Sequence, residues 1–448
     1  MNSMSTISQY AAALRDGRSS SVALTEAALE RIGAPDGEGG RAFTRVYAEP
    51  ARAAARASDV LRAAGLGRSV IDGLPISIKD LFDVAGEITM AGSIARRGEP
   101  VAAQHATVVR RLMAAGAVVI GRTNMTEFAY SGLGINPHYG TPLNAWDRGT
   151  ARIPGGSTSG GAVSVTDGMA VAAIGSDTGG SARIPAALCG LAGFKPTARR
   201  VPITGVLPLS PSLDSIGPIA RSVACCAQLD AILSGEDYPL PPPATLRGLR
   251  LAVPGTLALD GMDAHVAASF QSALTRLSAS GVLVHEIPVP AFAKLAGINA
   301  KGGFTAAEAW AWHRDLIARA ADRYDPRVVS RILRGRDMTA ADYLDVLHAR
   351  NCWKAEVEAS ITGFDALVMP TVPVVAPAVA ELMASDDAYF RANGLMLRNP
   401  TLINFLDGCA LSIPCHETGS APVGLMVAGP ALSDQRTISI GLAIEMSL

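Results

Sequence analysis

Residues 154–197 read PGGSTSGGAVSVTDGMAVAAIGSDTGGSARIPAALCGLAGFKPT, and this stretch decides how the rest of the chain is organised. Two Gly-Gly-Ser turns end at Ser157 and Ser181, and they bracket a segment of small apolar residues, 162–174. We expect this segment to be packed and to fix the two turns relative to each other.

The turn that ends at Ser181 suits the binding of a developing negative charge. The two glycines before the serine remove side-chain bulk, so that successive backbone N–H groups can converge on one point, as an oxyanion hole requires. Pro185 suits the first turn of a following helix, whose N-terminus would add positive potential nearby. A glycine turn with a capping serine would give the same local pattern, so this turn alone leaves both interpretations open.

A lysine upstream lies in an apolar run. Residues 71–84 are rich in apolar and β-branched side chains and predict a strand with Lys79 near its end. A lysine buried there would have a lowered pKa and could act as a neutral base. The alternative is a lysine whose stem lies on the strand while its ammonium group reaches water.

Composition excludes several classes of protein. The chain has 448 residues, of which 49% are hydrophobic and 18% charged, enough for one large α/β domain or for two to three smaller ones. The net charge of −1 and the lack of a basic stripe argue against a nucleic-acid partner. No apolar run of membrane-spanning length occurs, and the polar start 1–6 does not resemble a secretion signal, so we expect a cytoplasmic protein with no membrane contact.

Hydropathy and turn residues outline the elements. Helical patterns occur at 7–33, 49–64, 105–115, 222–233, 265–278, 295–362 and 437–446, and residues 125–130 are expected to continue helically. Strands are expected at 71–84, 117–120, 249–253, 282–287, 366–371 and 422–429. Strand, helix and strand in that order predict parallel crossovers.

Common hydrolase and metal motifs are missing. Neither serine lies in G-x-S-x-G, no lysine follows a serine by three residues, and there is no H-E-x-x-H or Walker loop. The six cysteines form no C-x-x-C pair and no zinc-ligand spacing with histidine, so no metal site is expected. The seven scattered histidines leave a Ser-His-Asp triad possible by order, but no local motif supports one.

Several motifs, in this order, resemble the amidase signature family. They are GLPISIKD at 73–80, GRTNMTEFA at 121–129, the two Gly-Gly-Ser turns, PAALCG at 185–190 and GFKPT at 193–197. The strongest motifs cover residues 70–220, and 422–430 also fits. Any one of them would be a weak signal, whereas their order makes the resemblance strong.

The resemblance implies a fold and a domain organisation. It predicts a single amidase domain over residues 1–448, with its signature core at about 70–220 and a twisted mixed, largely parallel sheet covered by helices on both faces. The helical part at 295–362 would be an insert that covers the pocket with Trp310, Trp312 and Trp353. Core aromatic side chains are the alternative interpretation of these tryptophans.

The resemblance also implies a Ser–Ser–Lys triad without a catalytic histidine. Ser181 matches the nucleophile that forms the acyl-enzyme, Lys79 matches the base, and Ser157 matches the bridging serine, which in this family follows a cis peptide bond. The site residues carried over beyond the triad are the backbone amides of Thr178, Gly179, Gly180 and Ser181 for the oxyanion hole, Ala129, Ser131 and Ser157 for substrate binding, and Asp177 and Arg183 as supporting residues.

The implied activity is hydrolysis of a C–N amide bond, other than a peptide bond, in a small carboxamide, aryl amide or ureide. An acyl-serine intermediate would release ammonia or an amine, with no metal or organic cofactor. The alternative within the family is a glutaminase-type A subunit of a tRNA-dependent amidotransferase, which needs a partner subunit. The third class is a binding protein with a decayed site, and the presence of all three triad residues disfavours it. The expected partner is a small-molecule amide, and members of the family often form homodimers.

Overall fold

The computed structural model describes residues 5–236 and 239–448, so that part of the polar start, 1–4, lies outside the described residues. Within them the chain forms one eleven-stranded sheet in the order β1-β3-β2-β4-β6-β5-β10-β11-β9-β7-β8. The strands are β1 (Phe43–Val46), β2 (Pro75–Lys79), β3 (Val118–Thr123), β4 (Ala172–Asp177), β5 (Ala192–Lys195), β6 (Ser215–Ala220), β7 (Arg250–Pro254), β8 (Leu283–Ile287), β9 (Ala366–Pro370), β10 (Cys409–Pro414) and β11 (Gly424–Gly429).

Helices connect and cover these strands. The α-helices are α1 (Ile7–Arg15), α2 (Ser21–Ile32), α3 (Gly39–Ala42), α4 (Ala48–Ala63), α5 (Thr107–Ala114), α6 (Ser159–Thr166), α7 (Arg183–Leu188), α8 (Val223–Ser234), α9 (Ala264–Ala279), α10 (Ala291–Ile298), α11 (Gly303–Ala320), α12 (Pro326–Leu333), α13 (Ala340–Ser360), α14 (Val379–Met383), α15 (Asp386–Leu406) and α16 (Asp434–Ser447). Short 3-10 turns are η1 (Glu127–Ala129), η2 (Arg148–Thr150), η3 (Ala321–Arg323) and η4 (Arg334–Asp337).

Local signals explain several helix boundaries. The predicted helical stretch 7–33 is divided, because the chain turns at Gly17 with φ +69° and the Ser20 hydroxyl then accepts from the Ala23 N–H to start α2. In the same way Ser222 caps α8, which ends at Gly235 in the left-handed conformation. The predicted helical regions at 49–64, 105–115, 222–233, 265–278 and 437–446 are confirmed.

The sheet is mixed, as predicted, but it is not largely parallel. Four of the described strand pairs are parallel, β2 with β3 and β4, and β7 with β8 and β9. The other six described pairs are antiparallel. The prediction was wrong here because β5, β6, β10 and β11 meet strands that are distant in sequence, and the local strand–helix–strand pattern carries no information on their direction.

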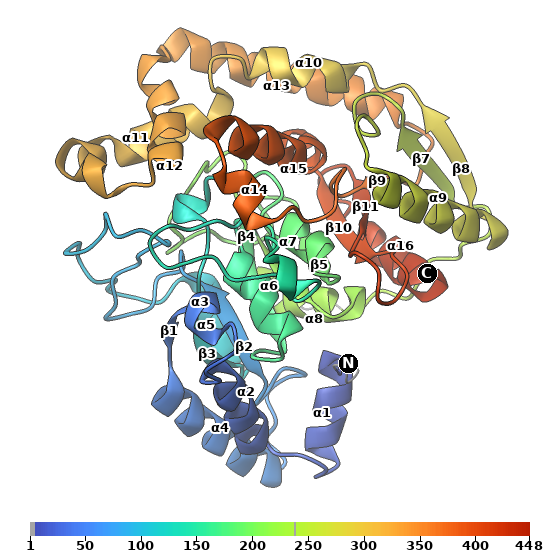
Figure 1. Ribbon diagram of the computed structural model, residues 1–448. Coiled ribbons are helices and arrows are strands. Elements are labelled where there is room, and N and C mark those ends of the chain that lie inside the picture. Colours follow the sequence, from blue (N-terminus) through green and yellow to red (C-terminus); the bar gives the residue numbers. More distant parts are fainter. Residues whose placement is uncertain (1–4, 237–238) are drawn as a thin grey trace.

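Two layers of helices enclose the sheet. Alternate side chains of β4 point to opposite faces: Ile174 belongs to the large core cluster that includes residues of α5, α8 and α16, while Ala173 belongs to a smaller cluster with residues of α6 and α7. In Figure 1, α2 and α4 lie at one end of the sheet, near β1 and β3, and α9 lies at the other end beside β7 and β8. Helices thus cover both faces, as predicted, and α6 and α7 hold the segments that carry the serine turns.

The region 295–362 is helical, as predicted, and Figure 1 shows α10, α11, α12 and α13 grouped on one side of the sheet, next to α15. Trp353 is buried against Phe292 and Phe405, with ring centroids 5.9 and 5.3 Å away. Trp312 lies beside Phe128 at 6.3 Å. These tryptophans are therefore packing residues, in agreement with the alternative interpretation given above.

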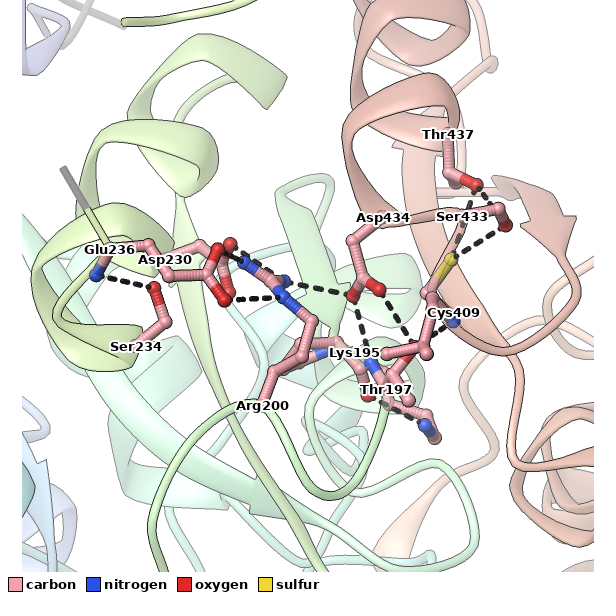
Figure 2. A network of polar contacts seen from close by, with 12 residues as sticks. Lys195, Thr197, Arg200, Asp230, Ser234, Glu236, Cys409, Ser433, Asp434 and Thr437 are labelled. Atoms are coloured by element: carbon pink, nitrogen blue, oxygen red, sulfur yellow. Dashed lines mark hydrogen bonds and ion pairs between the residues drawn. The ribbon is translucent and has the colours of Figure 1, made fainter. Parts of the chain in front are cut away.

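A polar network joins the last helix to the middle of the sheet (Figure 2). The carboxylate of Asp434, at the start of α16, accepts from the Thr197 N–H at 2.8 Å and from the Arg200 guanidinium at 2.9 Å. Lys195 is fully buried and donates to the Gly408 carbonyl at 2.7 Å. Burial, aided by the nearby Arg183 cation, lowers the pKa of Lys195 to about 8. The GFKPT motif is thus a structural junction between β5, β10 and α16.

Candidate active site

Lys79 is the last residue of β2 and is fully buried. Its neighbours Ile76 and Ile78 point into the large core cluster, so the alternation of the strand directs Lys79 to the opposite face. There its Nζ donates to the Ser157 hydroxyl at 2.8 Å and to the Ser176 hydroxyl at 2.8 Å. The lysine therefore does not reach water, and the buried alternative of the sequence analysis holds.

The environment of Lys79 favours its neutral form. Burial lowers the pKa of Lys79 to about 7. The negative charges of Asp177 and Asp214 act in the opposite direction and limit the decrease. A lysine with a pKa near 7 is substantially neutral at neutral pH and can accept a proton.

Ser157 lies directly before α6, in a tight crossing of two chain segments. The Gly156–Ser157 peptide bond is cis, as the family resemblance implied. A Cβ on Gly156 would lie 2.5 Å from the backbone N of Gly134, so this position requires glycine. The crossing holds the fully buried Ser157 at the end of the Lys79 side chain.

Ser181 lies in the turn between β4 and α7. Gly180 has φ +124°, and a Cβ there would lie 2.6 Å from both Ile184 Cδ1 and Pro400 Cβ. The Thr158 N–H donates to the Ser181 carbonyl at 3.3 Å, which joins the two serine turns through the backbone. Gly180 is therefore needed for both backbone conformation and space, whereas a Cβ on Gly179 would lie 3.3 Å from Thr401 Oγ1.

Asp177 and Arg183, predicted as supporting residues, form a fully buried ion pair at 2.9 Å. The Asp177 carboxylate also accepts from the N–H groups of Gly180 at 2.9 Å and Ala182 at 3.2 Å, and from the Asn404 amide at 2.9 Å. Burial raises the pKa of Asp177, but the Arg183 guanidinium outweighs it, and the net pKa lies well below its usual range. One ionised carboxylate thus holds the backbone on both sides of Ser181.

A cavity of about 190 Å³ opens at Ser181. Its wall includes four of the predicted site residues, namely Thr178, Gly179, Ala129 and Ser131. The helical region 295–362 adds Asn299, Gly302, Phe304, Thr305 and Arg331 to this wall. Ser181 and these four predicted residues therefore meet around one cavity, whereas Lys79 and Ser157 are fully buried and are not part of its wall.

The segment that carries Ala129 and Ser131 is not helical, contrary to the prediction for 125–130. It forms only the short turn η1, and Phe128 and Ala129 have φ values of +51° and +60°. The buried Glu127 explains this, because its carboxylate accepts from the Ser93 hydroxyl at 2.6 Å, from His138 Nε2 at 2.8 Å and from the Asp325 N–H at 2.7 Å. Tertiary contacts of one carboxylate override the local helical pattern.

Some residues of the site were not found from the sequence. Ser176 is a second acceptor for Lys79, and Asp214 accepts from the Thr178 hydroxyl at 2.5 Å. Asn404 and Thr401 come from α15, which was not predicted. No local pattern distinguishes any of these positions.

No group of three or more His, Cys, Asp or Glu side chains placed to hold a metal ion occurs in residues 5–236 and 239–448. In the same part of the chain, every helix is too short or too polar to cross a membrane. The described site is built from hydroxyl, ammonium, amide and carboxylate groups.

Comparison with known proteins establishes the family. A sequence model of the Amidase family matches residues 23–438, and the chain belongs to this family. Amidases of this family are hydrolases that act on carbon–nitrogen bonds, so the chain is a hydrolase of the amidase signature type, with a mixed sheet flanked by helices.

Its relatives differ in their named activities. The chain is 37% identical to the 2-amino-5-chloromuconic acid deaminase of Comamonas testosteroni, over 88% of this chain and 86% of that one. It is 34% identical to the A subunit of the glutamyl-tRNA(Gln) amidotransferase of Chloroflexus aggregans, over 98% and 96%. A solved structure described as an amidase superposes with a TM-score of 0.89 at 32% identity, over 99% of this chain and 100% of that one.

Proposed function

We propose that this protein hydrolyses the C–N bond of a small amide through an acyl-serine intermediate on Ser181. The observation that carries the proposal is the fully buried Lys79, whose side-chain nitrogen lies 2.8 Å from the Ser157 hydroxyl beside the cavity that Ser181 lines. Lys79 differs from the equally buried Lys195, because its Nζ contacts two serine hydroxyls, whereas Lys195 donates to backbone carbonyls.

The proposed steps follow from the positions of the protons. Neutral Lys79 takes a proton from Ser157, and Ser157 takes one from Ser181 as Ser181 Oγ attacks the amide carbon. The oxyanion receives hydrogen bonds from backbone amides of the turn 178–181. The predicted donor Gly180 is an exception, because its N–H already donates to the Asp177 carboxylate at 2.9 Å. The relay then protonates the departing nitrogen, the C–N bond breaks, and water hydrolyses the acyl ester in the same way.

One contact of the relay forms only with substrate in this proposal. Among the described residues, no direct hydrogen bond joins the hydroxyl groups of Ser157 and Ser181. Catalytic hydrogen bonds are often long in an enzyme without substrate and tighten in the reactive complex.

The rate of acylation should depend on pH with a midpoint near 7. Lys79 must be neutral, and its neutral fraction rises as the pH passes its pKa of about 7. We expect kcat/KM to rise from about pH 5 to about pH 8 and then to level off, measured as ammonia release from one amide. A flat profile from about pH 5 to 9, with a solvent isotope effect showing that chemistry limits the rate, would contradict the role of Lys79.

The cavity wall suggests which amides fit. Among the described residues that line it, Arg331 alone carries a charge. Its guanidinium donates to the Tyr130 carbonyl and lies 4.3 Å from the centre of the Tyr130 ring, so that the cation is held at the wall. An arginine with donors left for a ligand binds a carboxylate well. We therefore propose that the substrate carries a carboxylate besides its amide, a choice supported by the relative named for an acid.

Arg331→Leu should separate acidic from neutral amides. We expect kcat/KM for succinamate, which bears a carboxylate, to fall by roughly 10- to 100-fold, the contribution of a hydrogen bond to a charged group. The neutral amide butyramide should change by less than about threefold, because it does not use the guanidinium. Equal losses for both substrates would mean that Arg331 only supports Tyr130 and does not select the substrate.

The A subunit of an amidotransferase is the second candidate, since the chain aligns with such a protein over 98% of its length. Ammonia release from a panel of succinamate, benzamide, butyramide, an ureide and glutamine by the isolated chain distinguishes the two. Turnover of a simple amide by this chain alone supports the free-standing amidase. If the isolated chain releases no ammonia from any of these substrates, and hydrolyses glutamine once a partner subunit is added, the result supports the amidotransferase.

A further inference from the structure

The carboxylate of Glu308 connects the helical region 295–362 to a loop of the active site. Glu308 lies on α11, and its Oε2 accepts from the Ser210 hydroxyl at 2.6 Å and from the Ser212 N–H at 3.1 Å. Its Oε1 accepts from the Ser212 hydroxyl and from the Tyr343 hydroxyl at 2.7 Å. Three of these four donors belong to the loop 209–214, so the carboxylate is used mainly to hold that loop.

A second carboxylate carries the connection from the loop to the serine turn. Asp214 is buried, and its side chain accepts from the N–H groups of Leu209 at 3.0 Å and Ser210 at 3.1 Å. It also accepts from the Thr178 hydroxyl at 2.5 Å. A continuous series of hydrogen bonds therefore runs from Glu308 through Ser210 and Asp214 to the first residue of the turn that ends at Ser181.

Arg350 of α13 makes a parallel connection. Its guanidinium donates to the Ser212 carbonyl at 3.1 Å and to the carbonyls of Phe405 at 2.9 Å and Asn404 at 3.2 Å. The Asn404 amide in turn holds Asp177. The helical region is thus connected through Asp214 to Thr178 and through Asn404 to Asp177, at the start of the nucleophile turn.

We propose that Glu308 is a positioning residue that fixes the loop 209–214 and, through Asp214, the Thr178 end of the oxyanion-binding turn. This inference rests on the proposed function of Ser181. Backbone donors stabilise an oxyanion only when they are held within about 0.5 Å of the required position. Leu209 and Leu213 of the same loop line the cavity, so the loop sets both its wall and the turn.

Glu308→Gln, made in the full chain, tests this role. Each carboxylate oxygen of Glu308 accepts two of the four hydrogen bonds. The glutamine NH₂ that replaces one oxygen cannot accept, so two of the four bonds are lost while the side-chain volume is kept. We expect kcat to fall about tenfold with KM within about threefold, because the change affects the charge that develops in the transition state. A trifluoromethyl ketone analogue of the substrate, which forms a tetrahedral adduct on serine, should bind about tenfold less tightly, while the product acid binds unchanged.

The matched control is Asp315→Asn on the same helix, whose carboxylate is 86% exposed and lies about two turns beyond Glu308. This variant should keep kcat within about twofold. An equal loss of kcat in both variants, or a Glu308→Gln effect on KM alone, would overturn the proposal, because either result points to general destabilisation or to substrate contact.

Hydrogen–deuterium exchange provides a readout that does not need turnover. In Glu308→Gln the amides of 209–214 and of 178–181 should exchange faster than in the unaltered chain, and in Asp315→Asn they should not. Unchanged exchange at these two segments would overturn the connection. If the unaltered chain hydrolyses no amide, the proposed function fails, and the exchange experiment still decides whether Glu308 holds the turn.

Discussion

Ser181→Ala should lower the rate of amide hydrolysis by roughly ten-thousand-fold or more, the size of effect seen when the nucleophile of a serine hydrolase is removed. Alanine fits the site without rearrangement, because the turn is held by backbone hydrogen bonds to Asp177 and not by the Ser181 hydroxyl. Ammonia release under saturating substrate measures the loss. Circular dichroism and thermal unfolding should match those of the unaltered chain.

Covalent labelling identifies the nucleophile independently of the substrate. A fluorophosphonate should add one label to the peptide that contains Ser181, detected by mass spectrometry, and Ser181→Ala should remain unlabelled. Ser164→Ala serves as the control, because Ser164 is a buried serine of α6 that donates to the Gly161 carbonyl at 2.7 Å. It should be labelled and active. Labelling of Ser181→Ala at another serine, with activity retained, would assign the nucleophile elsewhere.

Lys79→Met should also cost several orders of magnitude in kcat/KM, because it removes the base that finally accepts the proton in the proposed relay. Methionine fills most of the volume of the lysine but cannot accept a proton. Single-turnover acylation followed across pH measures the effect. The residual rate should lose the midpoint near pH 7, and a loss of less than about tenfold would mean that another group acts as base.

The same substitution has an expected signature in stability. The pKa of Lys79 in the folded chain is about 7, below its unperturbed value of about 10.4, so protonation favours the unfolded chain. The loss of folding stability that this protonation causes is absent above about pH 10, grows as the pH falls and is complete below about pH 7. Lys79→Met removes this loss, and its thermal unfolding temperature should rise relative to the unaltered chain as the pH is lowered through this window.

Lys195→Met is the matched control for Lys79→Met. Lys195 is also fully buried with a lowered pKa, but it donates to the carbonyls of Pro196 and Gly408, in the junction of Figure 2. Its variant should show a related dependence of stability on pH and keep turnover within a few-fold. A comparable loss of activity in both variants would indicate that burial of a charge, and not the proton transfer, determines the rate.

Much of the fold follows from local sequence patterns, and the exceptions have physical causes. Helices with clear caps and many apolar residues, such as α8 and α9, lie where the sequence places them. Helix α15 was missed because Pro400 and the buried polar residues Asn393, Asn399 and Asn404 lie among its apolar positions. Strand direction in the middle of the sheet depends on pairing between segments some two hundred residues apart, such as β5 and β10, which no local pattern encodes.

The candidate site also contains residues that the sequence reveals and residues that it does not. Lys79, Ser157 and Ser181 were predictable because each lies in a motif of the family, and the structure brings Lys79 and Ser157 into contact. Their catalytic roles stay predictions. Ser176, Asp214 and Glu308 could not be predicted, because each acts through a contact with a distant segment. The local sequence around a serine does not show whether its hydroxyl accepts from a buried lysine or faces solvent.

The dependence of Asp177 on Asn404 has a consequence for how the protein is made. Every residue of the proposed triad is synthesised more than two hundred residues before Asn404 of α15, whose amide completes the Asp177 contacts. Strand β10, which pairs with β5 at the centre of the sheet, is made later still. A nascent chain therefore contains the three groups of the proposed triad before it contains α15 and β10, the segments that complete their framework.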